Sequence, residues 1–393
     1  MERKPGPLLK ICPRNGAKMG RSGGFLCAGG YAEGVKPLER EDLAHVLEHT
    51  GPLWERARGG RLFLAGATGF FGAWLLESLA YCNRELDLGV RATVLSRDPE
   101  GFLRRMPHLS GGSWLRFVTG DVRGLTLPED RRGERFDFVI HGASPTLPAK
   151  AGAPRERLET LIEGTRRMLA LAKAGEAKSM LYVSSGAVYG RQPGGVSHIE
   201  EGYTGAPDCL DSDSAYGEGK RVAELMCAHH AEETGLPIAI ARCFAFVGPH
   251  LPLDAHFAIG NFVGDALAGR PIRVNGDGTP MRSYLYAADL AIWLWTLLLR
   301  APEMKTNPAA FNVGSGEAVS LLELARAVAE EVNPKCAVEI AAAGPDAVKS
   351  GVAISGAARQ QYVPSVEKAE RELGLRAWIG LREAIKRTAA WHR

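Results

Sequence analysis

A glycine-rich turn between a short strand and a helix constrains the fold of this chain more than any other feature of its sequence. Residues 61–65 (RLFLA) form an apolar run typical of a buried strand, 66–72 (GATGFFG) form the turn, and 73–86 have the pattern of a helix. Glycines in such a turn let backbone N–H groups and the helix N-terminus approach a pyrophosphate. The order of strand, turn and helix predicts the opening of a parallel sheet that binds a dinucleotide. The predicted contacts are Gly66, Thr68, Gly69, Phe70, Phe71 and Gly72.

Further short apolar runs recur, and each is followed by a loop or a helix. The runs are 92–95, 115–118, 136–140, 180–183 and 238–243. This alternation predicts an α/β fold with a Rossmann-type, doubly wound parallel sheet and helices on both faces. Beyond about residue 248 the pieces are shorter and richer in Gly and Pro, which predicts a smaller mixed α/β lobe that binds the substrate. Helices are expected there at 262–267, 287–299, 321–332 and 381–391.

The chain divides into four predicted segments. Residues 1–40 are a basic tail, 41–60 a short helical lead-in, 61–247 the dinucleotide-binding domain and 248–393 mainly the substrate lobe, with a boundary that the chain crosses more than once. The tail has eight Lys and Arg against three Glu. We interpret it as disordered, and the alternatives are a basic arm that touches a partner or an upstream extension with translation starting at Met19.

Composition excludes several classes of protein. The chain is 45% hydrophobic and 24% charged, which is ordinary for a soluble globular protein. The longest apolar stretches, such as 290–299, are too short to cross a bilayer. The net charge is +3, and the tail accounts for more than that, so the body is slightly acidic and a nucleic-acid surface is not expected. Seven cysteines without a C-x-x-C pair favour a reducing cytoplasm.

Three residues in two later motifs form a candidate catalytic group. Ser185 belongs to 184–190 (SSGAVYG) after an apolar run, whereas Tyr216 and Lys220 belong to 216–220 (YGEGK) at the start of a helix. The i, i+4 spacing puts Tyr216 and Lys220 on one helix face. A free tyrosine has a pKa of about 10, and we expect Lys220 together with an oxidised nicotinamide to lower it. Tyr216 is then the base, Ser185 binds the same substrate oxygen, and Tyr216 and Lys220 also contact the cofactor.

The end of the second predicted strand distinguishes NAD from NADP. An acidic residue there accepts a hydrogen bond from a free ribose 2′-hydroxyl, whereas a 2′-phosphate favours a guanidinium. Ser96 stands at this position and Arg97 follows it, which favours NADP. Asp98 comes one residue later and could still bind a ribose, so NAD remains possible.

These motifs occur together with several others, namely 120–123 (GDVR), 141–144 (HGAS), 242–249, 261–262, 276–279, 282–286 and 312–316. In this combination the chain from about Arg61 onward resembles an extended short-chain dehydrogenase/reductase of the NAD-dependent epimerase/dehydratase family, whose members act on nucleotide sugars. The resemblance implies that Asp121 and Val122 contact adenine and that Ala143 and Ser144 line the nicotinamide side. It also implies that Asn261 and Arg282 hold the substrate diphosphate, and that a homodimer forms through 158–172 and 221–229.

Three residues differ from the family pattern, and they reduce the number of reactions that we expect the chain to catalyse. Gly186 and Ala187, which should line the sugar, stand where related 4,6-dehydratases carry an Asp-Glu pair and decarboxylase-like members an acidic residue. Ala245 stands where the family often has Asn. We therefore expect a nucleotide-diphosphate-hexose C4 epimerase, and the alternative is an NADPH-dependent 4-ketoreductase. A 4,6-dehydratase and a non-catalytic cofactor-sensing module are less favoured.

Other conspicuous residues have more ordinary interpretations. The neighbours His229 and His230 point about 100° apart on a helix, so no metal site is predicted. Trp293 and Trp295 are expected in the core or a subunit contact, and Cys243 as a buried apolar residue. Arg242 is either an ion-pair member or a diphosphate ligand. Glu218 and His256 are possible additional acid/base groups.

Overall fold

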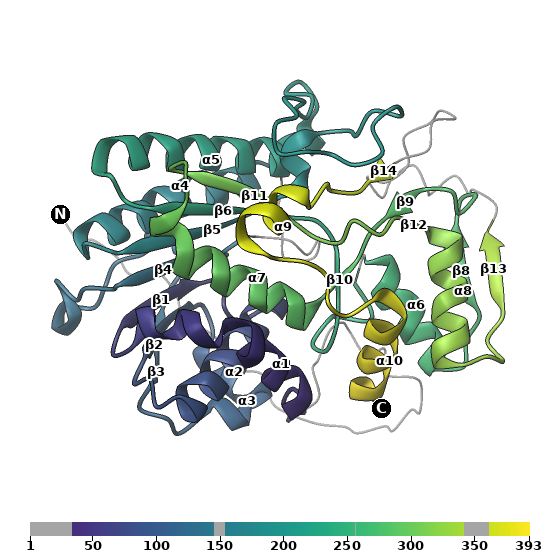
Figure 1. The fold of residues 1–393 in the computed structure, drawn as a ribbon, viewed down its shortest axis with the longest axis horizontal. Coiled ribbons are helices and arrows are strands. Elements are labelled where there is room, and N and C mark those ends of the chain that lie inside the picture. Colours follow the sequence, from purple (N-terminus) through teal and green to yellow (C-terminus); the bar gives the residue numbers. More distant parts are fainter. Residues whose placement is uncertain (1–33, 145–153, 256, 342–360) are drawn as a thin grey trace, which may run out of the picture. The chain divides into compact units, whose positions relative to one another are not determined.

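The six predicted strands pair into a seven-stranded parallel sheet (Figure 1), whose seventh strand, residues 309–313, was not predicted. The computed structural model describes residues 34–144, 154–255, 257–341 and 361–393. The strands of the sheet are β1 Arg61–Ala65, β2 Arg91–Ser96, β3 Leu115–Thr119, β4 Phe138–His141, β5 Ser179–Ser185, β6 Ile238–Cys243 and β11 Ala309–Val313. Their order, β11-β6-β5-β4-β1-β2-β3, reverses direction between β1 and β4. This is the doubly wound Rossmann arrangement, so the predicted fold class is confirmed.

Helices cover both faces of this sheet, which explains why its strands are continuous apolar runs. All seven residues of β5 are buried. Helices α4 Pro154–Ala174 and α5 Ala215–Thr234 pack on one face, whereas α2 Phe70–Glu85 and α7 Ala287–Arg300 lie on the other. Alternate residues of β1 accordingly enter different cores, Leu62 on the α2 side and Phe63 on the α4 side. Trp293 and Trp295 of α7 are fully buried, as the core interpretation predicts.

Short strands bring distant segments together beyond the large sheet. Strand β9 Met281–Arg282 lies between β12 Val319–Ser320 and β14 Gln361–Tyr362. Strand β7 Phe246–Val247 pairs with β10 Leu285–Tyr286, and β8 Ile272–Asn275 with β13 Val338–Ala341. The helices of this half are α6 Ala258–Leu267, α8 Leu321–Val332, α9 Glu367–Leu373 and α10 Leu381–His392. Because α7 and β11 return to the large sheet, the domain boundary near residue 247 stays a prediction.

The helical lead-in packs against the body as expected. Helix α1 Arg40–Thr50 and the 3₁₀ segment Gly51–Ala57 contact α7. Buried Asp42 accepts hydrogen bonds from Tyr286 at 2.6 Å and from Arg387 of α10 at 2.8 Å, which ties the start of the described chain to its end. Of the predicted tail 1–40, residues 1–33 lie outside the described residues, whereas in the described part Leu38 is buried and its N–H donates to the Glu77 carboxylate at 2.7 Å.

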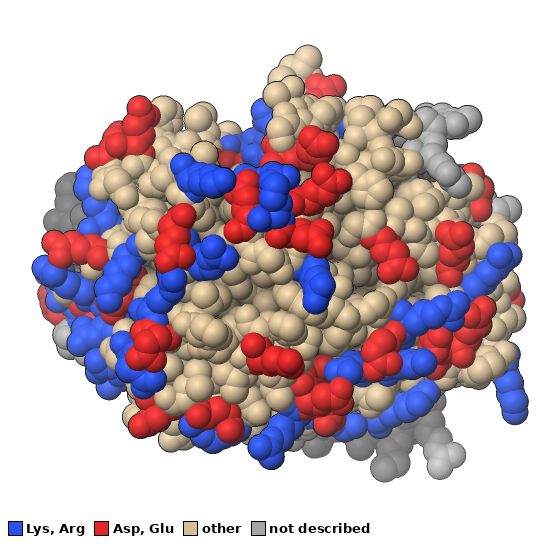
Figure 2. Space-filling view, viewed as in Figure 1, with Lys and Arg blue, Asp and Glu red and all other residues tan. Residues whose placement is uncertain are grey.

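The described surface is mixed in charge. Acidic and basic side chains are interspersed over the face in Figure 2, many of them in ion pairs such as Arg382 with Glu330 at 2.8 Å. Within the described ranges, every helix is too short or too polar to pass through a membrane.

Candidate active site

The glycine turn lies where the strand order reverses. Gly66 follows β1 and has φ +88°, a conformation that glycine adopts without strain. A Cβ at this position would lie 2.3 Å from the carbonyl carbon of Gly142, which follows β4. The Gly142 N–H donates to the Ala65 carbonyl at 2.8 Å. The backbone segments that follow β1 and β4 are therefore in close contact with each other, at the crevice in which doubly wound sheets bind their ligands.

Helix α2 starts at Phe70, three residues earlier than predicted, so the last part of the motif forms its first turn. Its N-cap residue is Gly69, which provides no side-chain cap, and a Cβ built on Gly69 would meet nothing within 4 Å. At Gly72, by contrast, a Cβ would lie 2.1 Å from the Ala67 carbonyl carbon. The first turn of α2 thus has no side-chain cap and has open space beside Gly69, and this arrangement fits the diphosphate of a dinucleotide.

At the end of β2, the structure separates the roles of three neighbouring residues. Ser96 is buried and its hydroxyl accepts a hydrogen bond from the Asp98 N–H at 3.1 Å. The Asp98 carboxylate caps helix α3 Pro99–Arg105 through the Gly101 N–H at 2.8 Å. Arg97 is exposed. Both Arg97, predicted to bind a 2′-phosphate, and Asp98, the alternative ribose ligand, are exposed, but one Asp98 oxygen already accepts the capping hydrogen bond of α3.

The predicted adenine contacts follow β3. Asp121 binds Arg123 at 2.8 Å, and this hydrogen bond is the main cause that lowers the pKa of Asp121, with a contribution from the charge of Arg97. Val122 is buried. Arg105, which sequence reasoning missed, donates to the Thr68 carbonyl of the glycine turn at 3.2 Å.

Ser185, Tyr216 and Lys220 come together at the ends of β5 and the start of α5. Ser185 and Ser144 are hydrogen-bonding neighbours of the Tyr216 hydroxyl. The Lys220 ammonium donates to the Val183 carbonyl at 2.6 Å and lies 5.9 Å from the centre of the Tyr216 ring. In the described part of the chain this is the only hydrogen bond of Lys220, so the buried ammonium keeps donors for a bound group.

Burial sets the pKa values of this group in the chain without cofactor, and the predicted lowering of the Tyr216 pKa by Lys220 together with an oxidised nicotinamide stays a prediction. Burial raises the pKa of Tyr216, and the hydrogen bonds of Ser185 and Ser144 only reduce that rise. Burial also lowers the pKa of Lys220 to about 8. Lys220 therefore does not lower the pKa of Tyr216 by itself, because the charge of each group is disfavoured in the same apolar surroundings.

Tyr362 of β14 is a site residue that sequence reasoning missed. Its hydroxyl is a hydrogen-bonding neighbour of Ser185, and a Cβ on Gly186 would lie 2.7 Å from the same oxygen. The Tyr362 ring packs on Phe244 at 4.6 Å between centroids, and the Arg282 guanidinium lies 6.0 Å from its centre. No motif surrounds Tyr362 in the sequence, because a two-residue strand leaves no periodic pattern.

The other predicted substrate and cofactor contacts are spread over several elements. Ala143 and Ser144 follow β4, and the Ser144 hydroxyl is buried. Ala187 is half-buried and donates its N–H to the Ser185 oxygen at 3.2 Å. Asn261 lies on α6, half-buried, and burial lowers the pKa of Arg282 on β9.

The ion-pair interpretation of Arg242 agrees with its contacts. The guanidinium binds Glu224 at 2.7 Å, the Tyr189 hydroxyl at 2.9 Å and the Glu201 carbonyl at 3.1 Å. Cys243 is buried, as expected for an apolar residue.

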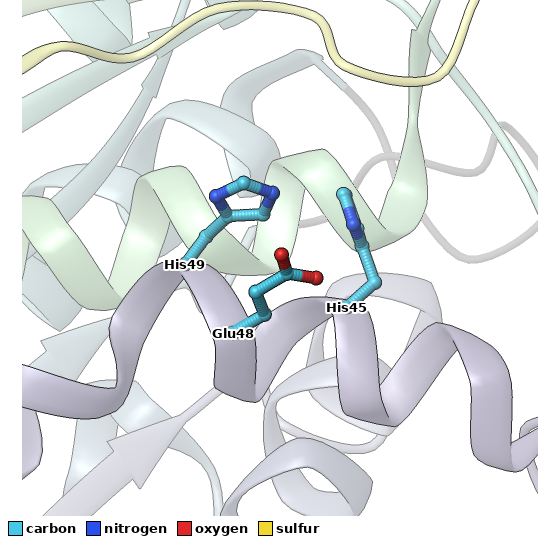
Figure 3. Close-up of side chains that lie close together, drawn as sticks. All are labelled: His45, Glu48 and His49. Atoms are coloured by element: carbon cyan, nitrogen blue, oxygen red, sulfur yellow. The ribbon is translucent and has the colours of Figure 1, made fainter.

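Glu218 and His256 are the possible additional acid/base groups. Glu218 faces Arg221 at 3.9 Å, and His256 lies outside the described residues. His229 and His230 form no cluster with other metal-ligating side chains in the described ranges, but His45, Glu48 and His49 of α1 do (Figure 3).

Comparison with known proteins places this geometry in a family. Residues 62–314 match the NAD dependent epimerase/dehydratase family. UDP-glucuronic acid decarboxylase 1 of Arabidopsis thaliana is 29% identical over 329 residues, which cover 83% of this chain and 68% of that protein. The fold resembles UDP-glucose 4-epimerase of Thermotoga maritima, with TM-score 0.68, 19% identity and coverage of 85% of this chain and 98% of that one. It also resembles dTDP-glucose 4,6-dehydratase of Streptomyces venezuelae, solved with NAD, with TM-score 0.68, 23% identity and coverage of 85% and 97%. Because the family match spans well over half of this chain, the chain is an enzyme of the NAD dependent epimerase/dehydratase family.

Proposed function

We propose that this protein is a nucleotide-diphosphate-hexose C4 epimerase. The observation that carries the proposal is the meeting of Ser185, Tyr216 and Lys220 beside a position, Gly186, that has no acidic side chain. Such a site can exchange a proton at one carbinol. The carbon–oxygen cleavage of a dehydratase needs a further acid and base, and glycine and alanine provide neither.

Residues of this chain divide the work as follows. The glycine turn and the first turn of α2 would hold the diphosphate of a bound dinucleotide, and Lys220 would donate a hydrogen bond to the dinucleotide. When bound, a nicotinamide supplies hydride acceptance and return. Tyr216 takes the proton of the C4 hydroxyl and gives it back, and Ser185 donates a hydrogen bond to that oxygen as it becomes a carbonyl. Because burial raises the pKa of Tyr216, the phenolate depends on positive charge brought by the bound cofactor.

Tyr362 adds a second phenol to the site. Its hydroxyl and that of Tyr216 both approach the Ser185 oxygen, which already accepts from the Ala187 N–H. A serine hydroxyl has two acceptor positions and one proton, so these neighbours orient that proton. We infer that Tyr362 positions Ser185 toward the substrate oxygen and occupies the space above Gly186.

Product analysis tests the proposal and separates it from two alternatives. The purified chain is incubated with UDP-glucose or UDP-galactose in one arm and UDP-glucuronic acid in another, with NAD or NADP. We expect the C4 epimer by NMR, with no net change in the near-ultraviolet absorbance of reduced nicotinamide. Release of CO₂ from the glucuronate would instead identify a decarboxylase like the Arabidopsis relative. Oxidation of NADPH with a 4-keto sugar would identify a reductase.

The choice of NADP over NAD is also a proposal. It is supported by the exposed Arg97, by the engagement of the Asp98 carboxylate with α3, and by the Arg105 guanidinium beside the glycine turn. The family description names NAD, and the dehydratase of Streptomyces venezuelae was solved with NAD bound. Direct binding measurements with NAD and NADP therefore decide between the two cofactors.

A further inference from the structure

Three side chains on helix α1 gather potential metal ligands outside the dinucleotide crevice. His45, Glu48 and His49 have the spacing i, i+3, i+4, which places them on one face of the helix. One ligand atom from each lies within 4.8 Å of the other two. In Figure 3 the three side chains project from neighbouring positions of α1, and the Glu48 carboxylate lies nearer the helix than the two imidazole rings. Glu48 is exposed and both histidines are half-buried, so an ion could reach the group from solvent.

A buried carboxylate orients the first histidine. His45 Nε2 lies 2.9 Å from Asp289 Oδ1, and the Asp289 side chain is fully buried. The other Asp289 oxygen accepts from the N–H groups of Trp378 and Ile379 at 2.9 and 3.0 Å. Because a carboxylate only accepts, it keeps a proton on Nε2 and leaves the lone pair of Nδ1 available. A carboxylate behind the histidine is the arrangement that usually orients a metal-ligating imidazole.

The second histidine is held by aromatic packing. The His49 ring stacks on Trp378 with 4.3 Å between centroids and an interplanar angle of 27°. Its edge meets the His45 ring at 4.7 Å. Asp289 binds the Trp378 backbone as well, so the same short segment supports both imidazoles. The side chains therefore lose little additional conformational freedom when an ion binds.

We propose that His45, Glu48 and His49 form a binding site for a divalent transition-metal cation of the Zn²⁺ class. Two imidazoles and one carboxylate are ligands that Zn²⁺ accepts with water in a fourth position, whereas Mg²⁺ and Ca²⁺ favour oxygen ligands alone. Tetrahedral Zn²⁺ with bonds of about 2.1 Å brings ligand atoms to about 3.4 Å apart. A rotation of the exposed Glu48 side chain and small rotations of the imidazoles close the remaining distance.

Metal titration of the full chain, purified without a histidine tag and treated with a chelator, tests this site. We expect one Zn²⁺ per chain by calorimetry, no competition by Mg²⁺, and a Co²⁺ visible spectrum with nitrogen and oxygen ligands. His49→Gln and Glu48→Gln should each weaken Zn²⁺ binding by about ten-fold or more. His229→Gln on α5 is the matched control, because it removes a helical histidine outside the cluster.

Each outcome decides the proposal. Because Glu48 is exposed, Glu48→Gln should keep the circular dichroism spectrum and melting temperature of the metal-free protein, so loss of binding cannot be ascribed to misfolding. Equal Zn²⁺ affinity in His49→Gln, Glu48→Gln and the parent chain would overturn the site. A thiolate-to-Co²⁺ charge-transfer band would overturn it as well, because cysteines would then be the ligands. None of these readouts depends on epimerase activity.

Discussion

Lys220 is a buried ammonium whose pKa, lowered to about 8 by burial, falls well below the ordinary lysine value of 10.5. Between these two values the unfolded chain binds the proton and the folded chain does not. The free energy of unfolding should therefore rise with pH in this window. Below about pH 8 both states are protonated, and the burial of the charge is fully unfavourable.

Comparison with Lys220→Met isolates this contribution. We expect the difference between the free energies of unfolding, parent chain minus variant, to increase by up to about 1.4 kcal/mol per pH unit from about pH 8 to about pH 9.5. Urea denaturation of both proteins at several pH values measures the difference. A difference that does not change over this range would contradict the lowered pKa of Lys220.

Arg97 offers a second test on a single side chain. If its exposed guanidinium binds a 2′-phosphate, Arg97→Ala removes a charge-assisted hydrogen bond worth about 1.5–3 kcal/mol. We expect NADP affinity to fall about 10- to 100-fold and NAD affinity to change little, as measured by calorimetry. Arg104→Ala is the control, because Arg104 is 64% exposed on α3 and pairs with Glu100. Equal losses for both dinucleotides in Arg97→Ala would refute the assignment.

Sequence motifs place residues better than they predict the electrostatics of those residues. Ser185, Tyr216 and Lys220 were found because each stands at a fixed point of a strand or helix. The rise that burial causes in the pKa of Tyr216 without cofactor could not be predicted, because it depends on packing by elements that no local pattern contains. Tyr362 was missed for a related reason: β14 reaches the site only by pairing with β9.

At the scale of elements, the turn after β5 carries a testable packing constraint. A Cβ on Gly186 would lie 2.7 Å from the Tyr362 hydroxyl and 2.8 Å from Phe244 Cζ. We expect Gly186→Ala to reduce the free energy of unfolding by about 1–3 kcal/mol, since two packed rings must shift. Gly194→Ala is the control, because a Cβ there meets nothing within 4 Å.

A double variant checks the cause of this loss. In the presence of Tyr362→Ala, the effect of Gly186→Ala should become smaller, because one of the two contacts is absent. Chemical denaturation of the single and double variants gives the coupling. Strictly additive effects would mean that Tyr362 does not restrict Gly186. The same restriction would explain why an acidic residue at this position is incompatible with the packing of β14.

Long elements could be predicted from the sequence, whereas short ones could not. Central strands of the large sheet such as β5 are buried on both faces and appear as apolar runs, whereas the edge strand β11 was not predicted. Helix α2 begins at Phe70 rather than residue 73, because the glycine turn ends within the first helical turn. Strands β7, β9, β10, β12 and β14 have two residues each, and their pairing depends on contacts between distant segments.

For the whole molecule, the family resemblance predicts a homodimer through α4 and α5. These helices pack side by side on one face of the sheet (Figure 1). Leu225 of α5 is 57% exposed, so more than half of this large apolar side chain is left unburied in a single chain. A second copy of α4 and α5 would bury it in a helix bundle, as the apolar core of an obligate interface requires.

Leu225→Glu tests this arrangement against a matched substitution elsewhere. Burying a carboxylate in the dimer contact is costly, so we expect the variant to have the mass of one chain by light scattering, where the parent chain has twice that mass. Ile340→Glu changes a side chain of β13 that is 55% exposed, and it should leave the dimer intact. A parent chain that is already monomeric, or a dimer that survives Leu225→Glu, would exclude this interface. Ser185 and Tyr216 come from β5 and α5 of one chain, so the monomeric variant should still bind the dinucleotide. Loss of binding would show that the dimer is needed to keep α5 in place.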